Sequence, residues 1–63
     1  MTMKFKQLAY GDKFMIVSKL INGVGRILYK FIPSKYSRYN AKQPLILGEY
    51  EEVEEDEEVI KVV

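Results

Sequence analysis

The 63-residue chain contains no cysteine and no histidine. Without cysteine no disulfide can form, and the two absences together exclude most zinc sites and the Ser-His and Cys-His nucleophile pairs. The chain also lacks an apolar run near the roughly 20 residues that a membrane-spanning helix needs. Its first six residues hold no long apolar stretch of the kind found in secretory signals. We therefore expect a cytoplasmic protein that enters no membrane and uses no metal or cofactor.

The length and composition predict one small globular domain, residues 1–63. Hydrophobic residues make up 48% of the chain and charged residues 30%, which is an ordinary balance for a folded protein. A chain of this size buries only about 60% of the surface that its unfolded form exposes. Its stability is therefore expected to be small, and single core substitutions should have large effects.

The net charge of +1 conceals a separation of charge along the chain. Residues 1–42 carry nine basic side chains and one acid (Asp12), a net charge of +8; residues 43–63 carry eight acids and one base (Lys61), a net charge of −7. Such asymmetry can indicate a nucleic-acid-binding face or an acidic interaction segment. The simpler interpretation, which we favour, is that the two halves pair across strands of one compact fold.

The hydrophobic pattern predicts an all-β fold, a small SH3-like barrel of about five short antiparallel strands. Asn22-Gly23 indicates a hairpin turn, since both residue types tolerate positive φ. Glutamates spaced by four residues would repel one another on a helix, so we expect the acidic end to form a hairpin with a turn at residues 55–57. The strands are predicted over residues 13–21, 26–32, 45–47, 50–54 and 58–63.

The clearest alternation lies in residues 26–32, where it predicts that Ile27, Tyr29 and Phe31 face the core together. Phe31→Ala should then cost most of the stability of the domain. The other expected core residues are Phe5, Leu8, Phe14, Ile16, Leu45, Leu47, Val53 and Ile60.

Four short motifs resemble those of short, mostly uncharacterised phage and bacterial proteins. An F-x-x-L-x-x-G-x-x-F start is present as Phe5, Leu8, Gly11 and Phe14. A middle strand carries Tyr29 and Phe31, Asn40-Ala41 precedes a short strand, and Asp56-Glu57-Glu58-Val59 forms an acidic turn before a valine-rich end. The resemblance implies an SH3-like small barrel encoded by a phage or mobile element, acting in the host cytoplasm. It implies no activity and no functional residue.

Tyrosines and basic residues interleave between residues 29 and 42, which makes this stretch the candidate binding site. Single-stranded nucleic acid requires such a mixture, because rings stack on bases and cations hold phosphates. Tyr and Arg are also frequent anchors of protein interfaces. A third interpretation leaves Tyr29 in the core and the loop tyrosines against the end of the barrel without function. The candidate binding residues are Lys30, Lys35, Tyr36, Arg38, Tyr39 and Lys42.

The glutamate-rich segment is the second candidate surface. It lacks the D-x-[DN]-x-[DN]-G spacing of a calcium loop, and consecutive acids on a strand point to opposite faces, so we expect no metal site there. Two interpretations of this segment remain: a solvated acidic edge of the sheet, or a protein-binding surface. The residues of this acidic surface are Glu51, Glu52, Glu54, Glu55, Asp56, Glu57 and Glu58.

Nothing in the sequence indicates an enzyme, because the serines lack a histidine partner and so small a domain offers little room for a substrate cleft. We expect a non-catalytic interaction module that binds and modulates a host or viral protein. One alternative is a nucleic-acid-binding barrel that uses the tyrosine-rich basic loop. Another is a structural subunit that forms a homo-oligomer through an exposed edge strand.

Overall fold

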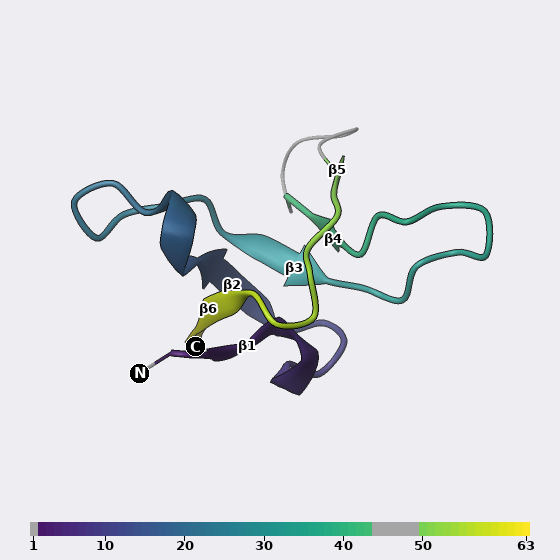
Figure 1. The fold of residues 1–63 in the computed structure, drawn as a ribbon, viewed down its shortest axis with the longest axis horizontal. Coiled ribbons are helices and arrows are strands. Elements are labelled where there is room, and N and C mark those ends of the chain that lie inside the picture. Colours follow the sequence, from purple (N-terminus) through teal and green to yellow (C-terminus); the bar gives the residue numbers. More distant parts are fainter. Residues whose placement is uncertain (1, 44–49) are drawn as a thin grey trace.

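The computed structural model describes residues 2–43 and 50–63, which form one antiparallel sheet in the order β1–β6–β2–β3–β4–β5 (Figure 1). The all-β prediction is confirmed. The described residues contain six strands rather than five, however, and within them the sheet is not closed into a barrel. The predicted strand 45–47, with Leu45 and Leu47, lies outside the described residues. The strands are Met3–Lys4 (β1), Lys13–Ile16 (β2), Leu28–Lys30 (β3), Ala41–Lys42 (β4), Tyr50–Glu51 (β5) and Glu58–Val62 (β6).

The sheet curls around one hydrophobic core. Two single-turn 3-10 helices accompany it, Phe5–Gln7 (η1), which adds Phe5 to the core, and Val17–Lys19 (η2), which adds no buried residue. Phe5 of η1 packs edge-to-face on Phe14 of β2, with ring centroids 5.2 Å apart. This arrangement suits the quadrupoles of the two rings. The predicted core positions Phe5, Leu8, Phe14, Ile16 and Val53 are buried, as are Leu28, Ala41 and Val59.

The Asn-Gly turn is confirmed, but the strand before it is shorter than predicted. Asn22 and Gly23 have φ values of 53° and 77°, and Ile21 and Val24 exchange both backbone hydrogen bonds around them. Such a pair of positive φ values defines a type I′ turn. The chain leaves the sheet after Ile16 and forms η2.

The acidic end contains the predicted turn and last strand but not the predicted hairpin. The Glu57 N–H donates to the Glu54 carbonyl across the turn, and β6 follows it. β5, however, pairs with β4, while β6 lies between β1 and β2. In this register Val59 sits opposite Ile16 and is fully buried.

Asn40 fixes the path between these two strands. Its side-chain Oδ1 accepts the Val53 N–H at 2.8 Å, and its Nδ2 donates to the Val53 carbonyl at 2.9 Å, so the amide replaces a neighbouring strand. We expect Asn40→Ala to cost about 1–3 kcal/mol, because it leaves both part-buried backbone groups unpaired. Urea denaturation measures the loss. The exposed Asn22→Gly exchange, which retains the positive φ of the turn, serves as the control, and equal stability of the two variants would contradict this role.

The alternation in β3 is present, but its phase is the reverse of the prediction. Leu28 and Lys30 face the core, at 1% and 9% exposure, whereas Ile27 is 42% exposed. Tyr29 and Phe31 are half-buried on the outer face. Period-2 alternation defines two sets of side chains and does not say which set faces inward. The prediction that Phe31 lies in the core is therefore wrong, and Ile60 is likewise only half-buried.

Candidate functional site

The outer face of the sheet carries a row of alternating lysines and tyrosines. Because Phe14, Leu28 and Ala41 point into the core, their strand neighbours point outward. The pairing register places Lys13 opposite Tyr29, Tyr29 opposite Lys42, and Lys42 opposite Tyr50. Directly opposed residues have Cβ atoms about 4.5–5.5 Å apart. These four residues, Lys13, Tyr29, Lys42 and Tyr50, are hereafter the tyrosine–lysine row.

Two further rings extend the row on the side of β5. The Tyr50 ring lies 6.0 Å from the Phe31 ring, at 69°, and 5.9 Å from the Tyr39 ring, at 32°. The Lys42 ammonium lies over the Phe31 ring, 5.8 Å from its centroid. Tyr39 and Tyr50 are each about half exposed. A shallow hollow of about 390 Å³ opens between these rings and is lined by Phe31, Ile32, Ser34, Ser37, Tyr39 and Tyr50.

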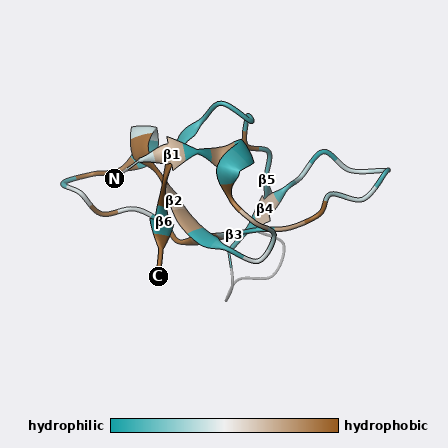
Figure 2. Ribbon diagram, turned by 90° about the horizontal axis from the view of Figure 1, so that it is seen from below, coloured by the Kyte–Doolittle hydropathy of each residue, from teal (hydrophilic) through white to brown (hydrophobic). Residues whose placement is uncertain are grey.

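The loop between β3 and β4 projects beyond the sheet (Figures 1 and 2). Two side-chain hydrogen bonds shape it: the Tyr36 N–H donates to Ser34 Oγ, and the Tyr39 N–H donates to Ser37 Oγ. Tyr36 is 87% exposed, and the ammonium of Lys35 lies over its ring. The loop therefore delivers Tyr39 to the outer face and leaves Tyr36 in solvent.

Arg38 has a different position from the other candidate binding residues. Its Nε lies 4.0 Å from a carboxylate oxygen of Glu52, and its side chain is highly exposed. This exposed pair is screened by water and is weak. Of the candidate binding residues, the structure brings Tyr39 and Lys42 together on the outer face, with Lys35, Tyr36 and Arg38 along the adjoining loop.

Lys30 is not a surface residue, so its assignment to the binding site needs correction. Its ammonium donates to the carbonyl of Phe5 at 3.1 Å and to that of Leu8 at 2.7 Å. It also lies 4.7 Å from the centroid of the Phe5 ring and 5.3 Å from that of Tyr10. Lys30 is two residues from the inward-facing Leu28 on β3, so it faces inward as well. The carbonyls around η1 accept hydrogen bonds from its ammonium group.

The acidic segment is divided among basic partners from the first half of the chain. Lys6 pairs with Asp56 at 3.3 Å, Lys19 with Glu51 at 2.8 Å, and Arg38 with Glu52, while Lys61 reaches back to Asp12. Every ion pair that the structure describes thus joins residues 1–42 to residues 50–63. These pairs engage Glu51, Glu52 and Asp56, so they support the interpretation that the two halves pair for part of the acidic segment.

Glu51 does not belong to an exposed acidic surface, because its side chain is only 24% exposed and points to the inner side of the sheet. Glu57 is also half-buried, and its carbonyl accepts the Phe5 N–H. The remaining members of the predicted acidic surface are exposed: Glu52, Glu54, Glu55, Asp56 and Glu58.

Sequence reasoning missed Lys13, Phe31 and Tyr50 as members of the candidate site and assigned Tyr29 to the core. The signal was present in the phase of β3: had Leu28 been placed inward, Tyr29 and Phe31 would have faced outward. The neighbours of Tyr29 in the row could not be found this way, because they depend on strand pairing.

A search against protein-family models, curated proteins and solved structures finds no match for the chain. In the part of the chain that the structure describes, no helix is long and apolar enough to cross a membrane. Within residues 2–43 and 50–63, no three acidic, cysteine or histidine side chains gather as metal ligands would.

Proposed function

We propose that the protein is a non-catalytic binding module that holds single-stranded nucleic acid on the outer face of β2, β3, β4 and β5. The observation that carries this proposal is the tyrosine–lysine row. Stacking on exposed rings and cationic contacts to phosphates are the two elements of sequence-tolerant binding to single strands. The row alternates them across four neighbouring strands.

Local charge supports this proposal despite the near-neutral chain. The ion pairs that the structure describes involve Lys6, Lys19, Arg38 and Lys61, and none of them involves Lys13 or Lys42. Lys13 and Lys42 therefore stand on the outer face without an ion-pair partner among the described residues. The overall isoelectric point therefore understates the positive potential of this surface.

The rings on this face are accessible enough to stack. Tyr39 and Tyr50 expose about half of their surface, and their ring planes are inclined by only 32° to each other. Tyr36, on the adjoining loop, is free of the sheet and adds a third exposed ring. Each stacked base contributes about 1–3 kcal/mol as judged by alanine substitution.

A protein partner is the second candidate, and one specific observation favours it. Ile32 and Tyr10 are 68% and 61% exposed and border a broad apolar hollow of about 540 Å³ beside Tyr29 and Phe31. Exposed apolar side chains around aromatic residues are typical of protein interfaces. The partner would be a host or viral protein, or a second copy of this chain bound on the same face.

Binding of oligothymidylate and oligouridylate, measured by fluorescence anisotropy at several salt concentrations, tests the proposal. Two phosphates held by Lys13 and Lys42 predict a slope of log K against log salt of about −1.4, and Lys42→Gln should reduce it to about −0.7. Tyr39→Ala and Tyr50→Ala should each weaken binding by about 1–3 kcal/mol. Lys6→Gln, which removes a cation away from the outer face, is the matched control and should leave affinity unchanged.

The same variants distinguish the two candidate partners. If neither oligonucleotide binds even at low salt, the nucleic-acid proposal is overturned. Capture of a protein from a host lysate that Tyr39→Ala and Tyr50→Ala abolish, with little dependence on salt, would then support the second candidate. A melting temperature that rises with protein concentration, and no longer does so in these variants, would identify the partner as a second copy.

A further inference from the structure

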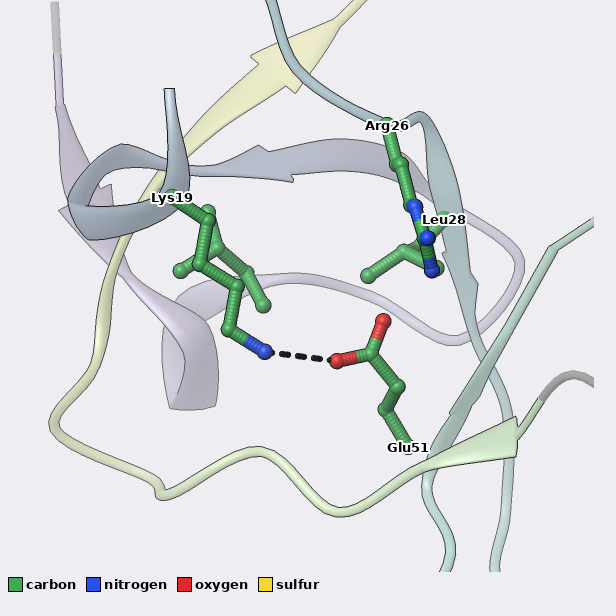
Figure 3. A pocket seen from close by; sticks show the side chains of 5 residues that line it. Lys19, Arg26, Leu28 and Glu51 are labelled. Carbon is green, nitrogen blue, oxygen red and sulfur yellow. Dashed lines mark hydrogen bonds and ion pairs between the residues drawn. The ribbon is translucent and has the colours of Figure 1, made fainter. Parts of the chain in front are cut away.

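A pocket of about 300 Å³ lies on the inner side of the curled sheet, between β2, η2, β3 and β5. Its floor is formed by Ile16 of β2 and Leu28 of β3, which are both buried. Lys19 of η2 and Arg26, just before β3, stand on opposite sides of its rim, with the carboxylate of Glu51 of β5 between them (Figure 3). The pocket therefore combines an apolar floor with a charged mouth.

The mouth holds one more positive charge than negative. Lys19 donates to the Glu51 carboxylate at 2.8 Å, which accounts for one cation and the only acid of the pocket lining that the structure describes. Arg26 points toward the same carboxylate from the other side (Figure 3), and no described ion pair includes it. The guanidinium thus presents its donors to the pocket.

We propose that this pocket binds a small carboxylate that carries a short apolar group. The carboxylate would bind the Arg26 guanidinium beside the Lys19–Glu51 ion pair, since a planar guanidinium fork matches the two oxygens of a carboxylate. The apolar group would lie on Ile16 and Leu28. The excess of one positive charge matches a monoanion, whereas Glu51 repels a more highly charged group such as phosphate.

The size and position of the pocket define the ligand further. A volume of about 300 Å³ is at the lower end of small-molecule sites, so the ligand has only a few carbon atoms. Two sources share this chemistry: a free short-chain carboxylate and the C-terminal carboxylate of a peptide. The site lies on the face of the sheet opposite the tyrosine–lysine row.

Titration of the isotope-labelled protein with butyrate, followed by NMR, tests this site, with uncharged butyramide as the ligand control. Butyrate should shift the resonances of Lys19, Arg26, Leu28 and Glu51, and butyramide should bind at least tenfold more weakly. Arg26→Gln should weaken butyrate binding about tenfold, the effect of one lost charge-assisted hydrogen bond. Arg38→Gln, which removes an exposed guanidinium from the β3–β4 loop, should leave it unchanged.

Glu51→Gln provides a prediction of opposite sign. Removing this carboxylate releases Lys19 and ends its competition with the ligand, so butyrate should bind several-fold more tightly, provided that the melting temperature shows a folded protein. Ala-Val with a free and with an amidated C-terminus separates the sources. If the free dipeptide binds more tightly than butyrate, the ligand is the C-terminus of a peptide. If butyrate binds more tightly, the ligand is a free short-chain carboxylate. Equal binding of butyrate and butyramide, or an unchanged affinity in Arg26→Gln, overturns the proposal.

Discussion

Lys30→Met is expected to destabilise the protein by about 2–4 kcal/mol. Methionine fills a similar volume but cannot donate to the Phe5 and Leu8 carbonyls, which receive hydrogen bonds from the Lys30 ammonium at 3.1 and 2.7 Å. Each hydrogen bond from a charged donor contributes about 1.5–3 kcal/mol, and the variant recovers part of the cost of burying the charge. For a chain of this length, whose total stability is of the order of 3–9 kcal/mol, the loss is severe.

Lys35→Met is the matched control, because it makes the same chemical change at an exposed position of the β3–β4 loop. It should change the free energy of unfolding by no more than about 0.5 kcal/mol. Urea denaturation of both variants measures the difference. If Lys30→Met were as stable as the unmodified protein, the cost of burying the charge would equal the gain from its hydrogen bonds, and Lys30 would not hold η1 against the sheet.

Leu28→Ala is expected to cost about 2–5 kcal/mol, since Leu28 is 1% exposed and the substitution leaves a cavity in the centre of the core. Ile27→Ala should cost less than about 1 kcal/mol, because Ile27 is 42% exposed and has little to lose on truncation. The two melting temperatures should differ accordingly, by roughly 4–8 °C for each kcal/mol in a domain of this size.

This pair of neighbouring residues tests the phase of β3 directly. The pattern of residues 26–32 alone predicts the opposite ranking, with Ile27 in the core. A larger loss of stability in Ile27→Ala than in Leu28→Ala would restore that phase and place the tyrosine–lysine row inside the protein. It would therefore remove the proposed nucleic-acid surface as well. The comparison thus checks the fold and the candidate site in one experiment.

The sequence alone determined the features that depend on the local conformational preferences of a few neighbouring residues. Asn22-Gly23 predicted its turn because few other pairs accept two positive φ values. The β-branched residues of 58–63 predicted β6, and repulsion among closely spaced glutamates argued against a helix before it. The apolar spacing also identified three core residues, Phe5, Leu8 and Phe14, because none of these side chains carries a polar group that would favour the surface.

Only the tertiary structure decided which face of β3 is buried and which strands are neighbours. Both faces of residues 26–32 carry large apolar side chains, so burial depended on partners distant in sequence, and the carbonyls of Phe5 and Leu8 made the inward position of Lys30 acceptable. The place of β6 between β1 and β2 is likewise a long-range choice, because it pairs the end of the chain with residues 3–4 and 13–16. The tyrosine–lysine row exists only through the pairing of β2, β3, β4 and β5, because its four residues come from these four strands.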